Sequence, residues 1–377
     1  MMKVVIAPDS FKGNLSARQV CEAVMQGLHD VDPSIRAVAI PLADGGEGTA
    51  RAIGLAAKGE FRTVRVTGPL GGTVEAEFVL IRNGQTAVMD MASASGIELV
   101  AVDKLDPMKA TSYGTGELIR AALDAGAREL LLGIGGSATV DGGVGMAQAL
   151  GFEFLDTKGA EVGRGGGALQ GITSIRSTGA DPRLASTKIL VACDVTNPLL
   201  GPKGAAAVFG PQKGATEKTL PTLEAGLASL AAAWKKAGLA PDVNQAGDGA
   251  AGGLGAMLRV QLKAEMRSGA RTVMEYAGFL DQIADADLVI TGEGRTDSQT
   301  AHGKLCAVVA DECKARKVPV ALLSGALSGD LQAMLNRFDY AVSIACGEVG
   351  LEAMMAAAPQ NLRFAAANLT RALRLGR

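Results

Sequence analysis

Five segments of this chain have the length and apolar character of buried parallel strands, and they lie towards the two ends of the sequence. They cover residues 3–8, 36–42, 286–291, 318–323 and 340–345. Amphipathic stretches at 16–28, with Ser16 as a candidate N-cap, and at 304–316 follow the first and third segments. This alternation favours an open, doubly wound parallel sheet, because consecutive parallel strands need a helical crossover between them.

The long interval between the second and third strands predicts an inserted domain. Two strands before a gap and three after it match a five-stranded flavodoxin-like sheet that is interrupted after its second strand–helix unit. We therefore expect an α/β protein with a discontinuous flavodoxin-like domain at 1–60 and 282–377, and a second α/β domain with glycine-rich loops at 61–281. Paired crossings between two domains predict a cleft that closes by a hinge.

The composition argues against several classes of function. The chain has 377 residues, of which 48% are hydrophobic, 20% charged and 3% aromatic, and its formal net charge is -2. Without a basic surface or rings on which bases can stack, we expect no nucleic-acid partner. No apolar segment has the length and lack of charge of a membrane span or a signal peptide, so we expect a cytoplasmic protein that binds no membrane. The sequence does not indicate an oligomeric state.

Cysteine and histidine are too sparse for a zinc site. Five cysteines are scattered without a C-x-x-C pair, at Cys21, Cys193, Cys306, Cys313 and Cys346, and there are only two histidines. This pattern is typical of reduced thiols in a cytoplasmic protein.

A bare glycine loop within the inserted domain predicts an anion site. An apolar run at 130–132 opens into a loop from Gly133 to Gly145, which leads into a short helical segment. Such loops can turn several N–H groups towards phosphate near a helix dipole, here from the candidates Gly135, Gly136, Ser137 and Thr139. Asp141 in the same loop would repel phosphate unless a metal ion lies between them or the substrate offers it a hydroxyl, and we predict it as a metal ligand.

Carboxylates and glycines follow three of the strands predicted for the first domain, where open α/β sheets bind their ligands. The polar residues there are Asp9, Ser10 and Lys12, then Asp44 and Glu47, and then Glu293, Arg295 and Asp297. The lysine can neutralise phosphate as a point charge. The alternatives also stand, since a single aspartate at such a position can cap a helix and Lys12 can be a solvated lysine.

The inserted domain contributes further candidates. Gly114, Thr115 and Gly116 open a predicted helix and can face an anion. Asp194 and Asn197 follow an apolar run and can share a magnesium ion, which prefers oxygen ligands. An Asx turn ahead of Pro198 is the alternative for that segment.

A dinucleotide site competes with these hypotheses. Residues 133–138 match the G-x-G-x-x-A fingerprint, and Glu153 or Asp156 lies about 20 residues further on, where a ribose-binding acid is expected. Asp141 argues against it, because the carboxylate would face the pyrophosphate. Acidic glycine loops in both domains suit metal–phosphate chemistry better than hydride transfer.

Eight motifs resemble those of the bacterial glycerate kinases of the first type, in the same order and over nearly the whole chain. They are APDSFKG (7–13), ADGGEGT (43–49), ASASG (92–96), GTGELI (114–119), GIGGSATVDGG (133–143), ACDVTNPL (192–199), FGPQKGA (209–215) and TGEGR (291–295). The resemblance implies ATP-dependent phosphorylation of glycerate with Mg²⁺, at the 2-hydroxyl of (R)-glycerate, on a flavodoxin-like domain with a second α/β domain inserted. The chain departs from the family pattern at Val140, Asp248, Thr296 and Cys306.

The roles that follow are hypotheses for in-line transfer in the interdomain cleft. Asp194, Lys12 and Asp297 are the predicted catalytic residues, with Asp194 as base or magnesium ligand. The predicted nucleotide contacts are Gly135, Gly136, Ser137, Thr139, Gly114, Thr115 and Gly116. The predicted substrate contacts are Asp9, Ser10, Asp44, Glu47, Glu293 and Arg295, and the predicted metal ligands are Asp194, Asn197 and Asp141. For the substrate carboxylate, Lys12, Lys213 or Arg295 are the candidate cations.

Three other functions stay open at this point. A glycerate 3-kinase would belong to the same reaction class. A nicotinamide-dependent hydroxyacid oxidoreductase would follow from the dinucleotide fingerprint. A sensor would bind a phosphosugar or glycerate without turnover.

Overall fold

In the computed structural model, which describes residues 1–239, 242–297, 305–330, 332, 336–347 and 350–375, the chain forms two compact units. The first unit comprises Met1–Asp44, Leu55–Ala57 and Ala270–Arg377, and the second comprises Gly45–Gly54 and Lys58–Gly269. The main crossings lie at Asp44–Gly45 and Gly269–Ala270, whereas the sequence predicted an inserted domain at 61–281. The cleft and the hinge predicted between the domains stay predictions.

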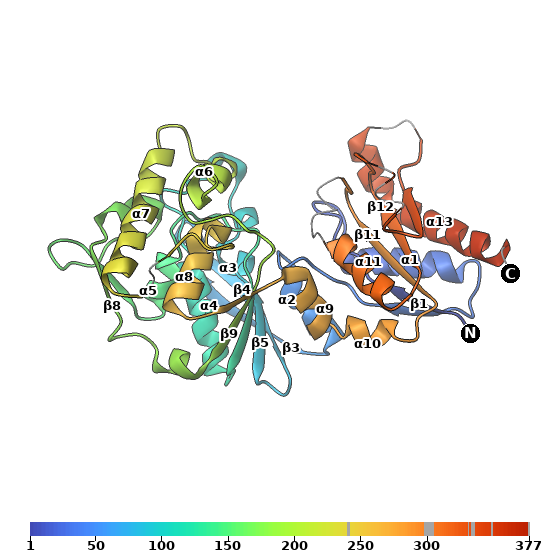
Figure 1. Ribbon diagram of the computed structural model, residues 1–377, viewed down its shortest axis with the longest axis horizontal. Helices are drawn as coiled ribbons and strands as arrows, with labels where there is room; N and C mark the ends of the chain where they lie inside the picture. The colour runs from blue at the N-terminus through green and yellow to red at the C-terminus, as the bar shows by residue number, and fades with distance from the viewer. Residues whose placement is uncertain (240–241, 298–304, 331, 333–335, 348–349, 376–377) are drawn as a thin grey trace. The chain divides into compact units, whose positions relative to one another are not determined.

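The first unit is built on a five-stranded parallel sheet (Figure 1). Its strands are β1 (Lys3–Ile6), β2 (Arg36–Ala39), β11 (Leu288–Glu293), β12 (Val320–Ser324) and β13 (Tyr340–Ser343). Their order across the sheet is β13-β12-β11-β1-β2. Counted within this unit, that is the order 2-1-3-4-5 of the flavodoxin-like fold, which confirms the predicted fold class.

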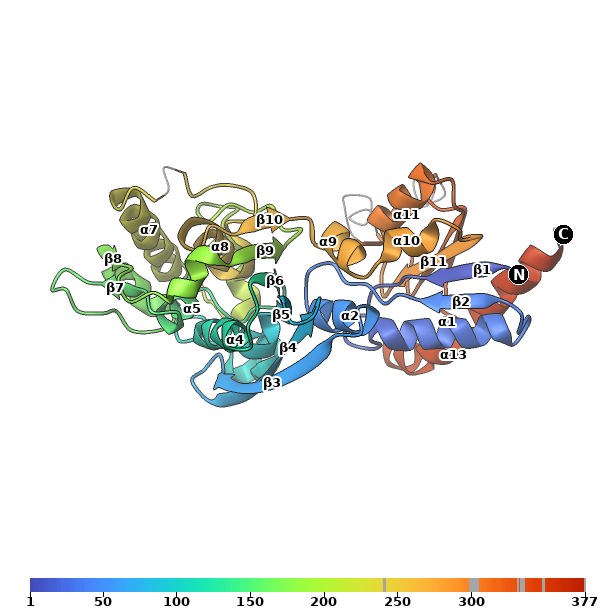
Figure 2. The ribbon, with the colours of Figure 1, turned by 90° about the horizontal axis from the view of Figure 1, so that it is seen from below.

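Helices cover both faces of this sheet. They are α1 (Ala17–His29), α9 (Gly269–Tyr276), α10 (Phe279–Ile283), α11 (Leu305–Ala315) and α13 (Leu351–Leu375). Figure 2 shows α1 and α13 side by side on one face, with α10 and α11 on the other. The two covered faces explain why β1, β11 and β12 are buried along their whole lengths and apolar nearly throughout.

Local sequence signals account for the way α1 begins and packs. Ser16 caps the helix as predicted, since its side chain accepts from the Gln19 N–H while the Gln19 side chain accepts from the Ser16 N–H. Gly27 lets α13 approach closely, because a Cβ there would lie 2.1 Å from the Arg363 carbonyl oxygen. The predicted helix at 304–316 is observed as α11, although residue 304 itself lies outside the described residues.

The second unit is built on a six-stranded mixed sheet with the order β10-β9-β6-β5-β4-β3. Its strands are β3 (Glu60–Thr67), β4 (Thr73–Ile81), β5 (Thr86–Asp90), β6 (Glu129–Gly133), β9 (Lys188–Ala192) and β10 (Glu265–Arg267). The last four run parallel, and the β3–β4 hairpin joins β5 in antiparallel pairing. A separate antiparallel pair consists of β7 (Glu153–Leu155) and β8 (Ser174–Arg176).

Six helices of the second unit contribute residues to one large apolar core. They are α3 (Ala92–Ser95), α4 (Tyr113–Asp124), α5 (Val144–Ala149), α6 (Ala205–Phe209), α7 (Leu220–Lys236) and α8 (Leu254–Gln261). Helix α2 (Thr49–Ala56) begins in the second unit, and its last two residues belong to the first. The 3-10 helices are Ile97–Leu99, Val102–Lys104, Gly166–Gly171, Pro182–Ser186, Pro211–Lys213 and Ala250–Gly253. Among the helices in the described part of the chain, none combines the length and the apolar character that a bilayer crossing requires.

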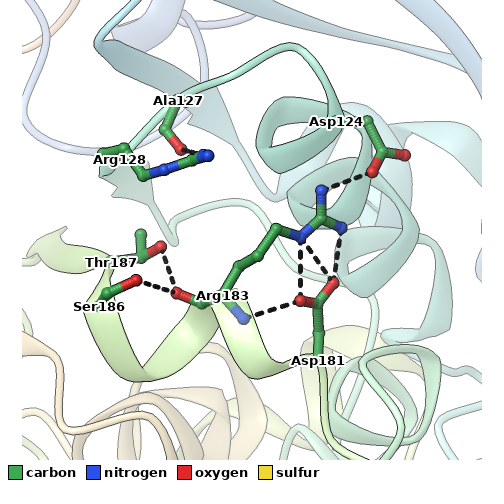
Figure 3. A network of polar contacts seen from close by, with 7 residues as sticks. All are labelled: Asp124, Ala127, Arg128, Asp181, Arg183, Ser186 and Thr187. Atoms are coloured by element: carbon green, nitrogen blue, oxygen red, sulfur yellow. Dashed lines mark hydrogen bonds and ion pairs between the residues drawn. The ribbon is translucent and has the colours of Figure 1, made fainter.

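A polar network anchors the segment that leads into β9 (Figure 3). Arg183 donates from Nη1 to Asp124 at the end of α4, at 2.7 Å, and from Nε and Nη2 to both carboxylate oxygens of Asp181. The Ser186 and Thr187 hydroxyls donate to the Arg183 carbonyl oxygen. The network thereby ties the start of β9 to α4, and β9 is the strand whose carboxyl end carries Asp194.

Candidate active site

Three carboxylates of the first unit line one cavity at the carboxyl end of its sheet. Asp9 follows β1, Asp44 follows β2 and Glu293 ends β11, and these three strands are neighbours. The cavity has a volume of about 500 Å³. Its polar lining consists of Asp9, Ser10, Lys12, Asn14, Asp44, Glu293, Arg295 and Asn361. The structure therefore brings together five of the six predicted substrate contacts and the predicted catalytic residue Lys12.

The negative charge at this end of the cavity is only partly compensated by Lys12. Burial, and then Asp44, raise the pKa of Asp9 to about 7, although Lys12 and the Ser10 N–H oppose the shift. Burial alone would lower the pKa of Lys12, but Asp44 and Asp9 together raise it. Lys12 Nζ lies 3.2 Å from Asp44 Oδ2. The cavity therefore favours a bound cation beside its carboxylates.

A polar contact that the sequence did not predict holds Glu293. The buried Thr296 Oγ1 lies 3.0 Å from Glu293 Oε1 and 2.9 Å from Ser324 Oγ. Glu293 is itself 8% exposed, so this hydroxyl helps set its orientation. Thr296 was noted in the sequence only as a departure from the family pattern, and the structure gives that departure a physical role.

Arg295 and Asp297 lie next to the carboxylates in the chain. Arg295 lines the cavity, with Nε 3.9 Å from Asp297 Oδ2. Asp297 is not among the described residues that line the cavity. Its predicted catalytic role stays a prediction.

The second unit has its own polar edge, where β6 and β9 end side by side. The loop at 45–48 covers these strand ends, because a Cβ on Gly45 would lie 2.8 Å from the Ala192 carbonyl oxygen and one on Gly135 would lie 2.6 Å from Gly46 Cα. Gly136 and Glu47 are exposed beside this contact. Of the predicted phosphate loop, Gly135 and Gly136 are thus the residues that a ligand can reach.

Asp194 stands at the same edge, directly after β9, with an exposed side chain. Its Oδ1 accepts from Ser268 Oγ at 2.9 Å and from the Gly269 N–H at 3.0 Å, which holds the carboxylate in one orientation. Asn197, its predicted co-ligand, donates instead to the Lys203 carbonyl oxygen at 2.8 Å and thereby holds its own loop.

Asp141 needs a correction, because its surroundings match a structural role and not that of a metal ligand. The side chain is 0% exposed. Oδ2 accepts from the Ser112 N–H, the Ser112 hydroxyl and the Gly145 N–H, and Oδ1 accepts from the Gly143 N–H. Burial raises the pKa of this carboxyl, and the four donors oppose that shift. The carboxylate therefore holds the turn into α5 against the start of α4.

Gly114, Thr115 and Gly116 also need a correction, since all three are buried in helix packing and cannot contact a nucleotide here. A Cβ on Gly114 would lie 1.9 Å from the Thr67 carbonyl oxygen, and one on Gly116 would lie 2.2 Å from that of Met146. The Thr115 hydroxyl pairs with Ser95 Oγ at 2.9 Å. These glycines allow α4 to approach β3 and α5.

Replacing Gly114 with alanine is therefore expected to destabilise the protein by about 1–3 kcal/mol, because the added methyl group overlaps a backbone oxygen. Urea unfolding would measure the loss. Gly72→Ala is the matched control, since a Cβ there meets nothing within 4 Å. A Gly114→Ala protein as stable as the control, with weakened nucleotide binding, would restore the predicted contact.

A buried lysine, Lys213, forms hydrogen bonds with the remainder of the glycine loop. Lys213 is 2% exposed, and its Nζ donates to Ser137 Oγ at 2.6 Å and to the Thr139 carbonyl oxygen at 2.8 Å. Burial lowers the pKa of Lys213 to about 7, although Asp141 opposes the shift. Ser137 is 6% and Thr139 0% exposed. Neither residue is accessible as a nucleotide contact, and Lys213 cannot reach a substrate carboxylate in this arrangement.

Two further departures from the family pattern are explained by the core of the second unit. Val140 is 0% exposed and belongs to the apolar core, so the change there alters packing and not a ligand contact. Asp248 is buried and pairs with Arg259, which donates from Nε at 2.7 Å and from Nη2 at 2.8 Å.

The remaining departure, Cys306, is buried in α11 of the first unit, with Sγ 3.5 Å from Thr291 Oγ1.

Asp90 supports the loop at 45–48 from the end of β5. Its carboxylate accepts from the Gly48 N–H at 2.9 Å and from the Ala50 N–H at 3.1 Å, so it caps α2 from another part of the chain. Burial raises the pKa of Asp90 to about 7, although these two hydrogen bonds lower it. The charged cap is therefore maintained at an electrostatic cost.

Asp90 should make stability depend on pH between its ordinary pKa of 3.8 and about 7. Because the folded state holds the proton more tightly than the unfolded state, its contribution falls as the pH rises through this window, by at most about 1.4 kcal/mol per pH unit. The Asp90→Asn variant has no titratable group at this position. Relative to that of the wild type, its free energy of unfolding should therefore become larger as the pH rises from 4 to 7. Urea unfolding of both proteins would measure this. A difference that stays constant with pH would contradict the assignment.

The dinucleotide alternative fails on the geometry of its loop. The fingerprint at 133–138 follows β6, but α5 begins only at Val144. In a dinucleotide fold the glycines open the helix, so that its N-terminus faces the pyrophosphate. Here Ser137 instead pairs in an antiparallel bridge with Gly96.

Comparisons with known proteins agree with the family resemblance of the eight sequence motifs. The model of the Glycerate kinase family matches residues 4–374. A Bacillus subtilis protein named glycerate kinase is 48% identical, and an Escherichia coli protein named glycerate 2-kinase is 46% identical. Each alignment spans 100% of this chain and 99% of the relative. A crystal structure of glycerate kinase 2 from Salmonella typhimurium LT2 superposes with a TM-score of 0.88 at 45% identity, and the match covers 100% of this chain and 99% of that one.

Proposed function

Because the chain belongs to the glycerate kinase family and is a kinase, we propose that it transfers the γ-phosphoryl group of ATP to the 2-hydroxyl of (R)-glycerate. The observation that carries this proposal is the full-length similarity to a protein named glycerate 2-kinase. The cluster of carboxylates and cations at the end of a flavodoxin-like sheet supports it, because phosphoryl transfer depends on positioning and charge neutralisation.

Magnesium fits the donor set of the first unit. Asp9, Asp44 and Glu293 line one cavity together with the cations Lys12 and Arg295. Mg²⁺ uses one or two carboxylates and completes its shell with water and phosphate oxygens. Within the described part of the chain no three His, Cys, Asp or Glu side chains are placed to hold a metal ion together, so at most two of these carboxylates would share the ion with water and phosphate oxygens. When bound there, the ion would neutralise phosphate charge.

Side chains and backbone groups of the protein would supply the base, the cations and the anion-binding groups of the reaction. Asp194 is the candidate base at the edge of the second unit, because it is exposed and held by two donors. Lys12 and Arg295 are the cations that can meet developing negative charge. The accessible backbone at Gly135 and Gly136 suits an anionic group such as a carboxylate.

An assay of ADP release from ATP and glycerate tests the reaction. We expect ADP with (R)-glycerate and Mg²⁺, and no change in nicotinamide absorbance. No ADP with either enantiomer would overturn the proposal. Binding of glycerate without turnover would favour a sensor, and a change at the nicotinamide band would favour an oxidoreductase.

We also propose that the protein works in the cytoplasm on a small-molecule substrate. Its five cysteines are all free thiols, which agrees with a reducing compartment. The location can be tested with a tagged protein in a test strain, by comparing its recovery from the cytosol with its export to the periplasm. Recovery from the cytosol is expected.

A further inference from the structure

The cavity of the first unit has a second, apolar end that glycerate does not need. This end is lined by Phe11, Ile344, Leu351, Met354, Met355 and Ala358. Ile344 follows β13, and four of these residues come from the first turns of α13. The cavity thus combines a charged end with an apolar one.

The size and chemistry of the cavity exceed those of a three-carbon acid. Cavities of about 300–1,000 Å³ hold drug-sized ligands, and this one measures about 500 Å³. Glycerate carries a carboxylate and two hydroxyls, so it has no group that gains from contact with methionine and leucine side chains. A ligand with one flat apolar end and one anionic end would use the whole cavity.

The position in the sheet also suits a nucleotide. β1 lies between β2 and β11, and the chain leaves β1 towards one side and reaches β11 on the other, so the order of strands reverses there. Ligands of doubly wound folds bind beyond the carboxyl ends of the strands at this switch point. Asp9 and Glu293 stand at the ends of the two strands that flank it.

The apolar end offers contacts that suit a purine. Methionine side chains adapt to a flat ring, and sulfur makes favourable contacts with aromatic edges. The Asn361 amide lines the same cavity and can pair with a polar base edge. Asn14, which also lines it, is fixed by donating to the Met355 carbonyl oxygen at 2.9 Å and steadies the start of α13.

We propose that the cavity of the first unit binds ATP, with its base against Met354 and Met355 and its phosphates towards Asp9, Lys12 and Glu293. The inference rests on the proposed use of ATP, and it reverses the sequence-based assignment of nucleotide and substrate. The edge of the second unit, with Gly135, Gly136 and Asp194, is then left for glycerate.

Binding of a fluorescent ADP analogue with Mg²⁺, titrated without glycerate, tests this assignment. Met354→Glu puts a charge against the base and should raise the Kd about tenfold. Ala356→Glu is the matched control, because it adds the same charge to the exposed side of the same helix, at a residue that does not line the cavity. Its Kd should stay within about twofold of the wild type.

Gly136→Asp tests the edge of the second unit, because it adds a charge there. Aspartate tolerates the φ of +73° at this position. The variant should leave the Kd for the ADP analogue within about twofold and raise the KM for glycerate. A Kd that is unchanged in Met354→Glu but raised in Gly136→Asp would overturn the inference while leaving the kinase activity in place. If wild type releases no ADP from ATP and glycerate, the proposed function fails instead.

Discussion

Asp194→Asn is expected to lower kcat by about two orders of magnitude or more and to leave the fold intact. The asparagine oxygen can still accept from Ser268 Oγ and the Gly269 N–H, which hold Oδ1 of the native carboxylate. Only the charge, and the ability to take a proton, are removed. The loss should therefore appear in turnover and not in the melting temperature.

Steady-state kinetics with ATP and glycerate would measure this effect. Ser268→Ala is the control, because it removes a hydroxyl that donates to Asp194 and keeps the carboxylate. Its effect on kcat should be much smaller than that of Asp194→Asn. A variant Asp194→Asn that retains kcat within about threefold of the wild type would remove this residue from the mechanism.

Asp141→Ala is expected to cost about 3–5 kcal/mol of folding stability, because it leaves four buried donors without their acceptor. The donors come from the start of α4 and from the turn into α5, so their loss should loosen the contact between these helices. Urea unfolding at neutral pH would measure the change in the free energy of unfolding.

Asp156→Ala is the matched control for Asp141→Ala. Asp156 Oδ1 accepts from two backbone N–H groups, but its turn is exposed, and a loss of about 1 kcal/mol or less is expected. If Asp141→Ala unfolded like the wild type and instead lost its dependence on Mg²⁺, the metal-ligand hypothesis would return.

The fold of the first unit could be predicted because its signals are local and repeated. Apolar strand-length runs mark β1, β11 and β12, and the capping box at Ser16 marks the start of α1. The 2-1-3-4-5 order then follows from two strands at one end of the chain and three at the other.

The roles of the glycine loops could not be predicted as well, because a glycine in the sequence is equally compatible with close packing and with ligand contact. Gly114 and Gly116 admit neighbouring carbonyl groups, whereas Gly136 is exposed and Gly135 is partly exposed even though it packs closely against Gly46. Asp141 was misassigned for a related reason. Its four donors come from Ser112, Gly143 and Gly145, and sequence alone does not bring Ser112 to this loop.

The apolar end of the cavity was missed, since Met354 and Met355 resemble ordinary core residues of an amphipathic helix. Only the placement of α13 beside the ends of β11 and β12 turns them towards a cavity that also contains Asp9. A methionine pair at the start of a helix that follows a strand end is the weak signal that could have pointed there.

Phosphorus NMR of the product would show whether phosphate is transferred from ATP to the 2-hydroxyl of glycerate. The 2-phosphate is bonded through oxygen to a carbon with one hydrogen, so its resonance should be a doublet that grows in step with ADP. A triplet would place the phosphate on the terminal carbon and contradict the claim, and so would ADP release with inorganic phosphate as the only other product.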